Sequence, residues 1–247
     1  MKPEIHTYPG LPELSRAAAE DICHRAEEAI KERDTFTLVL SGGSTPRLLH
    51  EELARQPISK RIEWQKTHIF WGDERLVEPV HPDSNYGVAF RALVSKVDVP
   101  PANIHRVITE SRSASAAAEE YEQTLRHFFC PPAESEDHAY FPSFDVILLG
   151  LGQDGHTASL FPGDPALEEK YRWVVAVSGA RGSPPIPRIT LTFPVINKAR
   201  CAIFLASGRE KREVFQKIIS NHETVAYPAA RVRPSGKLLW FVDELMV

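Results

Sequence analysis

Two residues, Asp154 and His156, have the types and the spacing that acid–base chemistry requires. They stand one glycine apart in a segment that follows an apolar run at 144–149. The run predicts a buried strand, and the glycines after it predict a tight loop. Open α/β sheets gather their ligands at the carboxyl ends of such strands. We therefore expect the chemistry of this protein in the loop that holds Asp154 and His156.

Two other interpretations of this loop stay open. Its glycines spell G-x-G-x-x-G after a strand, which is typical of dinucleotide sites. Such a site needs a full helix after the third glycine and an acidic residue at the end of the next strand. Here Pro162 and Pro165 interrupt the following segment, and the next predicted strand, 173–177, ends in Ser178. Alternatively, His156 is only a hydrogen-bonded loop histidine.

A second glycine-rich loop, SGGSTP at 41–46, follows the predicted strand 35–40 and precedes a predicted helix. Glycines let backbone N–H groups approach an anion, and the start of a helix offers unpaired donors and the positive end of its dipole. Gly43, Ser44 and Thr45 are therefore candidate phosphate-binding residues. The loop lacks the lysine of a P-loop, and a plain turn with a helix cap is the alternative.

Charged residues follow the predicted strand 68–72: they are Asp73, Glu74 and Arg75. Taken alone, they are typical of a solvated strand edge. If this strand, 35–40 and 144–149 are parallel neighbours, the loops after the three strands lie side by side. Asp73 and Arg75 would then share one site with the SGGSTP loop and with His156.

Strands and helices alternate along the chain, which indicates an α/β protein. A length of 247 residues suits one such domain over 1–247. The strands are predicted at 35–40, 68–72, 144–149, 173–177, 188–193, 201–206 and 238–242, the helices at 11–31, 47–55, 84–93, 114–129 and 209–219, and a surface loop at 131–142. Lys211 falls in the first turn of the last helix, where the dipole disfavours a cation. It is a surface residue unless an anion lies beside it.

Composition excludes several classes of function. Hydrophobic residues make up 43% of the chain and charged residues 25%, which are ordinary globular values. The formal net charge of -4 argues against a surface for duplex nucleic acid. The amino terminus has no apolar signal segment, and no apolar run is long enough to span a membrane. We expect a cytoplasmic protein with neither nucleic acid nor membrane as a partner; the sequence leaves its oligomeric state open.

The cysteines do not indicate a disulfide framework or a zinc site. Cys23, Cys130 and Cys201 are odd in number and widely spaced. His127, Cys130 and His138 could be read as partial metal ligands, but the polar, proline-containing residues around them have the composition of a solvated connection. We expect no metal in this protein.

Six motifs, taken in order, resemble the 6-phosphogluconolactonases, a family within a superfamily shared with the glucosamine-6-phosphate deaminases. They are SGGSTP, WGDER, SNYG, LLGLGQDGHTASLFPG, P-x-RITLT and SGREK, spread from Ser41 to Lys211. DGHTASLFP is specific to the family, whereas SGGSTP is shared across the superfamily. The resemblance implies a doubly wound α/β fold, with a mostly parallel sheet flanked by helices on both faces. It also implies hydrolysis of 6-phosphoglucono-1,5-lactone to 6-phosphogluconate in the oxidative pentose phosphate pathway, without a cofactor.

The resemblance makes His156 the general base and Asp154 its partner. His156 would take a proton from water as the water attacks C1, and would later return it to the departing ring oxygen. Loop N–H groups and Arg75 are candidates to stabilise the developing oxyanion. A nucleophile elbow is absent, so we expect no acyl-enzyme. The substrate-binding and phosphate-binding candidates are Gly43, Ser44, Thr45, Asp73, Arg75, Arg188 and Lys211, of which Arg188 is the weaker cation and Asp73 matches a catalytic aspartate of the deaminases.

Three rival functions are set against this hypothesis. Deaminases of this superfamily carry a glutamate five residues after the D-G-H histidine, whereas this chain has Phe161 before Pro162. A sugar-phosphate sensor would not need His156, and no helix-turn-helix or basic arm is visible to connect it to DNA. A dehydrogenase, suggested only by the three glycines, is the third alternative.

Overall fold

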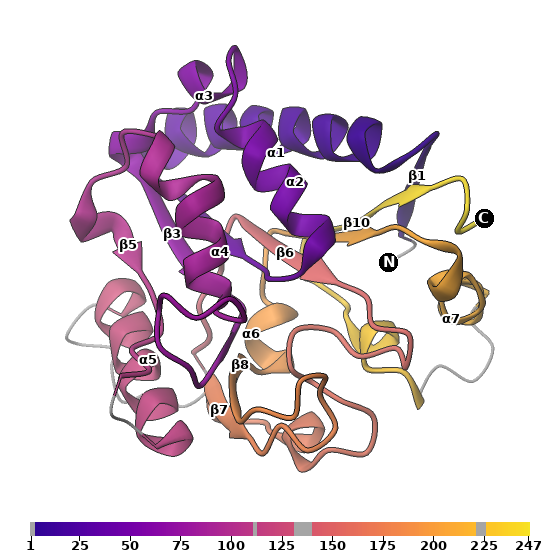
Figure 1. The fold of residues 1–247 in the computed structure, drawn as a ribbon. Coiled ribbons are helices and arrows are strands. Elements are labelled where there is room, and N and C mark those ends of the chain that lie inside the picture. Colours follow the sequence, from indigo (N-terminus) through magenta and orange to yellow (C-terminus); the bar gives the residue numbers. More distant parts are fainter. Residues whose placement is uncertain (1–2, 111–112, 131–139, 221–225) are drawn as a thin grey trace.

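A seven-stranded sheet, parallel throughout, forms the centre of the structure (Figure 1). The computed structural model describes residues 3–110, 113–130, 140–220 and 226–247, so most of the loop predicted at 131–142 lies outside the described residues. In order across the sheet, the strands are β1 (Glu4–Tyr8), β10 (Lys237–Asp243), β9 (Cys201–Ala206), β6 (Val146–Gly150), β2 (Phe36–Leu40), β3 (Thr67–Trp71) and β5 (Ile104–His105).

The helices connect these strands. They are α1 (Leu11–Arg33), α2 (Ser44–Leu53), α3 (Ile58–Arg61), α4 (Asn85–Ala92), α5 (Ala114–Phe129), α6 (Phe193–Ile196) and α7 (Arg212–Ile219), with short 3-10 turns that include η4 (Pro165–Glu168), η5 (Arg209–Lys211) and η7 (Pro228–Arg231). The prediction for α5 is confirmed at both ends. Within the described parts of the chain, every helix is too short or too polar to cross a bilayer.

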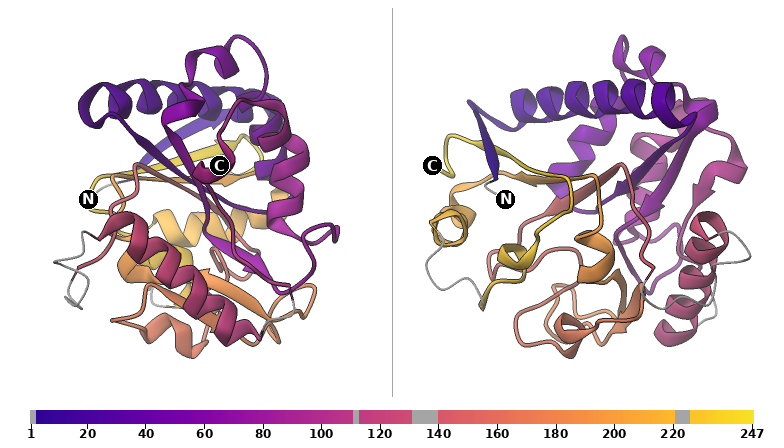
Figure 2. Two further views of the ribbon diagram at one scale, coloured as in Figure 1. Left: turned by 90° about the vertical axis from the view of Figure 1, so that its left-hand side faces the viewer. Right: turned by 180° about the vertical axis from the view of Figure 1, so that it is seen from behind.

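Side chains of the central strand β6 face two separate cores. Val146 and Leu148 belong to one core, and Ile147 and Leu149 belong to the other, because successive residues of a strand point to opposite faces. Helices α1 and α2 cover the first face, whereas α5, α6 and α7 pack on the second (Figure 2). The prediction of a doubly wound, mostly parallel sheet with helices on both faces is confirmed.

Strands β6, β2 and β3 are direct neighbours, and all three run in the same direction. The loops that follow them therefore leave the sheet side by side, as the sequence predicts. The charged residues after β3 are not a loop, however. They form β4 (Asp73–Arg75), which pairs with β8 (Arg188–Leu191) in a second, antiparallel sheet completed by β7 (Val174–Val177).

The structure corrects the predicted environment of Lys211. The helix expected at 209–219 is divided into the 3-10 turn η5 and helix α7, which begins at Arg212. Lys211 is the N-cap residue of α7 and does not lie within its first turn. This turn follows β9 directly, so it lies at the same edge of the sheet as the loops after β2 and β6.

Candidate active site

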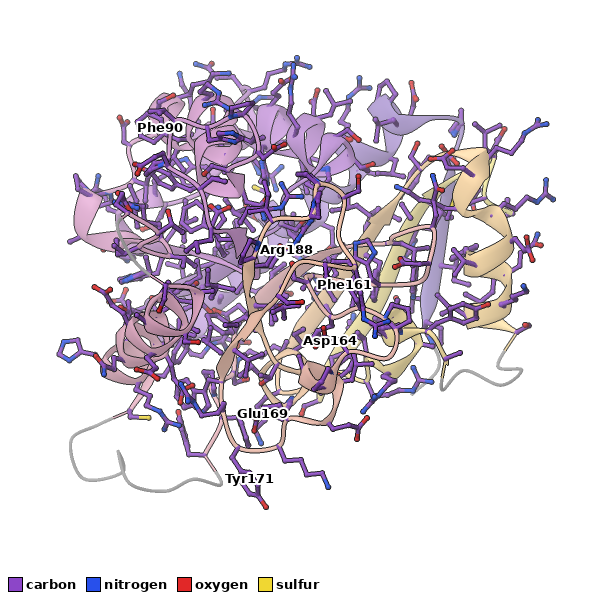
Figure 3. The ribbon with its side chains drawn as sticks, turned by 60° about the horizontal axis from the view of Figure 1, so that its bottom comes forward. Phe90, Phe161, Asp164, Glu169, Tyr171 and Arg188 are labelled. Atoms are coloured by element: carbon purple, nitrogen blue, oxygen red, sulfur yellow. The ribbon has the colours of Figure 1, made fainter. Side chains whose placement is uncertain are left out.

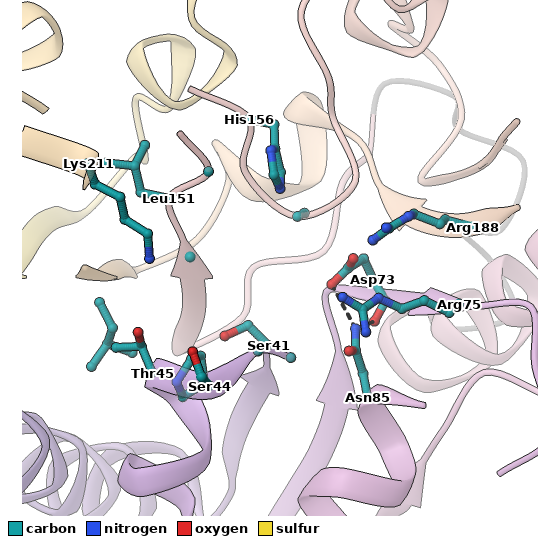
Figure 4. A pocket seen from close by; sticks show the side chains of 17 residues that line it. Ser41, Ser44, Thr45, Asp73, Arg75, Asn85, Leu151, His156, Arg188 and Lys211 are labelled. Atoms are coloured by element: carbon teal, nitrogen blue, oxygen red, sulfur yellow. Dashed lines mark hydrogen bonds between the residues drawn. The ribbon is translucent and has the colours of Figure 1, made fainter. Parts of the chain in front are cut away.

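A pocket of about 190 Å³ lies where the loops after β2, β6 and β9 meet the small sheet (Figure 4). Eight of the nine predicted site residues line it, namely Gly43, Ser44, Thr45, Asp73, Arg75, His156, Arg188 and Lys211. The ninth, Asp154, does not line the pocket but contacts the ring nitrogen Nδ1 of His156. The structure therefore brings together residues that span 169 positions of the chain, from Gly43 to Lys211.

The SGGSTP loop supplies the start of a helix as one wall of the pocket. Helix α2 begins at Ser44, three residues earlier than predicted, with Gly43 as its N-cap at φ 106°. This φ value favours glycine, and Gly43 has no side chain with which to cap the helix. The N–H groups of the first turn are thus left for an anion, beside the positive end of the helix dipole.

Asp73 is held in place by two hydrogen bonds to its carboxylate. Ser159 Oγ donates to one oxygen at 2.6 Å, and Asn85 Nδ2 donates to the other at 3.1 Å and to the backbone oxygen of Asp73 at 2.8 Å. Asn85 also lies against the SGGSTP loop, since a Cβ on Gly42 would come within 1.7 Å of Asn85 Oδ1. Sequence reasoning did not assign a role to Asn85 or Ser159, although the SNYG and DGHTASLFP motifs contain them.

Arg75 and Arg188 occupy directly paired positions on the antiparallel strands β4 and β8. Arg75 donates to the backbone oxygen of Asp83 at 2.8 Å, and Arg188 donates to that of Pro184 at 3.1 Å. In the described part of the chain, the buried Nε of each guanidinium has no hydrogen-bond partner. Burial lowers the pKa of Arg188, and the neighbouring Arg75 cation lowers it further. A buried and a half-buried cation side by side form a site for an anion.

Lys211 lies on the opposite side of the pocket, near Thr45 and Leu151, with His156 between it and the two arginines (Figure 4). Burial lowers the pKa of Lys211, whereas the carboxylates of Glu210 and Asp243 oppose that shift. The pocket thus has a cation at each end.

The turn that carries Lys211 is tied to the end of β10. Asp243, the last residue of that strand, accepts hydrogen bonds from Ser207 Oγ at 2.5 Å and from the backbone N–H of Gly208 at 3.0 Å. Lys211 closes the turn, because its N–H donates to the oxygen of Gly208 at 3.1 Å. Asp243 therefore fixes the path of the chain that leads into Lys211.

His156 points into the pocket from the loop after β6 (Figure 4). Asp154 fixes its ring. The distance from His156 Nδ1 to Asp154 Oδ1 is 2.5 Å, and the same oxygen accepts the backbone N–H of His156 at 3.1 Å. Burial raises the pKa of Asp154, but the hydrogen bonds and charge of His156 outweigh this effect and lower it overall. With Nδ1 donating to a carboxylate, Nε2 is the nitrogen left free to accept a proton.

Gly152 makes this arrangement of the loop possible. A Cβ at this position would lie 2.0 Å from His156 Nδ1 and 2.6 Å from Asp154 Oδ1. The loop closes on itself, since Gly152 N–H donates to the His156 oxygen at 2.9 Å, and Gly155 adopts φ 80°. The glycines therefore allow the loop to hold His156 in this position. A dinucleotide-binding fingerprint would need a helix after Gly155, but the segment there forms the Thr157–Leu160 bridge instead.

Phe161 packs against the ring of His156 but does not itself line the pocket. Its ring centre lies 4.6 Å from that of His156, and the Arg188 guanidinium lies 5.5 Å from the ring centre (Figure 3). Among the described residues, no three His, Cys, Asp or Glu side chains are grouped as ligands for a metal ion. His138, one of the three partial ligands weighed from the sequence, lies outside the described residues.

Beyond the site, the sequence of the whole chain resembles those of known proteins. The sequence model of the family described as "Glucosamine-6-phosphate isomerases/6-phosphogluconolactonase" matches residues 10–240. The chain belongs to this family. It is 41% identical to the 6-phosphogluconolactonase of Nostoc sp. (98% of this chain, 96% of the relative). It is 40% identical to a probable 6-phosphogluconolactonase of Arabidopsis thaliana (98% and 91%).

Solved structures of the same family have the same fold. The 6-phosphogluconolactonase of Trypanosoma cruzi superimposes with a TM-score of 0.89 at 32% identity, over 99% of this chain and 96% of that one. The enzyme of Thermotoga maritima gives 0.84 at 31% identity, over 98% and 100%. A monomeric glucosamine-6-phosphate deaminase gives 0.78 at 20% identity, a likeness of fold alone. The resemblance inferred from the six motifs is confirmed.

Proposed function

We propose that this protein hydrolyses 6-phospho-D-glucono-1,5-lactone to 6-phospho-D-gluconate, a step of the oxidative pentose phosphate pathway. The observation that carries the proposal is the imidazole of His156, which is oriented by Asp154 and lies between cations at the two ends of one pocket. The lactone presents a carbonyl carbon to be attacked at one end and a phosphate at the other. The family relationship supports the same substrate class.

The phosphate binds at the end of the pocket formed by α2 and Lys211. The uncapped N–H groups of the first turn of α2 and the hydroxyls of Ser44 and Thr45 are suitable donors for phosphate oxygens. Lys211 adds a positive charge that a bound dianion stabilises, which offsets the cost of burying the lysine. Binding energy from the phosphate positions C1 for attack, so a lactone without phosphate is a poor substrate.

His156 acts as the general base. Its Nε2 takes a proton from a water molecule as that water attacks C1, and the negative charge of Asp154 stabilises the imidazolium that forms. The C1–ring oxygen bond then breaks, and the imidazolium returns its proton to the departing ring oxygen. No covalent bond between protein and substrate forms at any stage.

Arg75 and Arg188 stabilise the charge that develops on the carbonyl oxygen. They form the other cationic end of the pocket, and the N–H groups of their guanidinium groups are suited to an oxyanion. The carboxylate of Asp73 has one donor on each oxygen and keeps further lone pairs, so it accepts a hydrogen bond from a sugar hydroxyl. This assignment gives Asp73 a binding role, different from that of the deaminase aspartate.

Phe161 argues against the alternative that this protein is a deaminase. The position where the deaminases have a glutamate is occupied here by an aromatic ring packed against His156 and Arg188. An apolar ring cannot exchange protons with a substrate, so this position cannot supply the acid–base group that deamination would need.

Acid release from freshly prepared 6-phosphogluconolactone tests the proposed substrate. Acceleration above the spontaneous rate is expected, with a much smaller effect on unphosphorylated gluconolactone. Turnover of glucosamine 6-phosphate in place of the lactone would overturn the proposal in favour of a deaminase. Saturable binding of 6-phosphogluconate without any turnover would overturn it in favour of a sensor.

A further inference from the structure

Glu74 is a buried carboxylate that stands between two pocket residues but does not line the pocket itself. Asp73 and Arg75, its neighbours on β4, both line the pocket. Successive side chains of a strand point to opposite faces, so Glu74 points away from the pocket, and it is 2% exposed. Burying a carboxylate this deeply destabilises the fold unless hydrogen bonds to the carboxylate offset the loss of its hydration.

Four donors surround the Glu74 carboxylate. The backbone N–H groups of Arg75, Asn85 and Tyr86 each donate to it at 2.7 Å, and Ser84 Oγ lies 3.3 Å from it. Asn85 and Tyr86 are the first two residues of α4, whose opening N–H groups have no partner within the helix. The N-cap hydroxyl of Ser84 accepts the N–H of Gly87 at 3.0 Å, and Glu74 accepts the N–H groups of Asn85 and Tyr86.

Asn85 links the Glu74 carboxylate to the residues of the pocket. It lines the pocket, donates to the backbone and carboxylate of Asp73, and lies against Gly42 of the SGGSTP loop. The start of α4 therefore connects two walls of the pocket, and Glu74 fixes where that start lies. A shift of α4 would move Asn85, which would release Asp73 and open a gap at Gly42.

We propose that Glu74 is a positioning residue of this site, which acts through Asn85 to hold Asp73 and the SGGSTP loop in the geometry that catalysis requires. The inference rests on the proposed function for its activity readout. Replacing Glu74 by Gln keeps the size of the side chain but turns an amide N–H₂ toward backbone donors. Two donors then face each other, and the start of α4 must move.

The assay is best run at pH 8, where the carboxylate is ionised. Burial raises the pKa of Glu74 to about 7, and the three backbone N–H groups that it accepts pull the pKa down. Asp73 on the same strand raises it, and the titratable groups of Arg106 and Tyr121 also interact electrostatically with Glu74. At pH 8 the form that accepts all four bonds predominates.

Glu122→Gln provides the matched control. Glu122 is also a buried carboxylate that accepts from arginines (Arg126 and Arg172) and from backbone N–H groups (Trp173 and Val174). It lies on α5, and none of these four partners lines the pocket, whereas Arg75 and Asn85, which donate to Glu74, both do. Both variants lose a similar kind of buried network and should melt at lower temperatures than the wild type. Only Glu74→Gln should lower kcat/KM on the lactone in folded protein, by on the order of 10-fold.

Two further measurements separate positioning from mere stability. The loss from Glu74→Gln should nearly vanish in an Asn85→Ala background, since the two residues act in one chain of contacts. In NMR spectra, the side-chain amide signal of Asn85 should shift in Glu74→Gln and stay in place in Glu122→Gln. Unchanged kcat/KM in folded Glu74→Gln, or a loss that multiplies with that of Asn85→Ala, would overturn the inference. If the wild type does not open the lactone, the proposed function fails, and the Asn85 signal alone decides the role of Glu74.

Discussion

Asp154 holds His156 through two atoms of the histidine at once. One carboxylate oxygen lies 2.5 Å from the ring nitrogen Nδ1 and accepts the backbone N–H of the same residue at 3.1 Å. Rotation of the ring would break its hydrogen bond to a carboxylate oxygen that the backbone of the same residue also holds in place. This fixes Nε2 toward the pocket before any substrate arrives, and catalysis benefits most from groups that need no reorganisation.

Asp154→Asn should lower kcat by roughly 100-fold and leave KM almost unchanged, since the charge that stabilises the imidazolium is lost while the binding residues stay in place. Steady-state kinetics on the lactone measures both parameters. Asp164→Asn, which changes the N-cap of η4 further along the same segment, is the control and should behave as wild type. A raised KM with an unchanged kcat would show that Asp154 binds substrate.

Gly152→Ala should lower activity by about 100-fold, because the new Cβ cannot fit 2.0 Å from His156 Nδ1 and the ring must leave its place. Gly72→Ala is the matched control at the same edge of the sheet. There the nearest atoms would lie 3.5 Å away, an ordinary van der Waals contact. Kinetics and a thermal melt of both variants test this prediction, and it fails if Gly152→Ala is folded and fully active.

Lys211→Met should raise KM for the phosphorylated lactone by about 10- to 100-fold, because a charge-assisted bond to phosphate is lost, and it should hardly affect unphosphorylated gluconolactone. Lys217→Met removes an exposed lysine of α7 that pairs with Glu213, and it should leave KM unchanged. Equal losses on both lactones would place the phosphate at the arginine end of the pocket.

The buried His50 makes stability depend on pH. Burial lowers its pKa from 6.5 to about 4, and both ring nitrogens lack hydrogen-bond partners among the described residues. The unfolded chain therefore takes up a proton at a higher pH than the folded protein does. The stability that neutral His50 contributes is fully present above pH 6.5 and is lost as the pH falls toward 4, by about 3 kcal/mol.

Urea denaturation of wild type and His50→Leu at several pH values tests this linkage. The free energy of unfolding of the variant should fall less steeply than that of the wild type between pH 6.5 and 4. Above pH 7 the two curves should run parallel. Equal slopes throughout the acid range would show that His50 is protonated in the folded protein.

Local sequence patterns were enough to predict five of the seven strands of the main sheet and the side on which the site lies, whereas the short edge strands β1 and β5 were missed. Helix α5 was predicted to the residue, because Ala117, Tyr121 and Leu125 recur at helical spacing and all three are buried. The convergence of the loops followed from the expectation that β2, β3 and β6 are parallel neighbours, since parallel strands end at one edge.

The second sheet could not be predicted, for a physical reason. Strand β4 has three residues, Asp73–Arg75, all charged, so neither length nor apolar alternation marks it. Its pairing partner β8 lies more than 100 residues away in the chain, and only the folded protein sets Arg75 opposite Arg188. For the same reason, the contacts of Asn85 and Ser159 with Asp73 are long-range and leave no local signal.

Hydrolysis of freshly generated 6-phosphogluconolactone by wild type and His156→Ala, followed as acid release, tests the central claim most directly. The wild type should accelerate opening above the spontaneous rate. His156→Ala, shown to be folded by circular dichroism, should lose nearly all of that acceleration. A folded His156→Ala protein that opens the lactone as fast as the wild type would contradict the assignment of His156 as the general base.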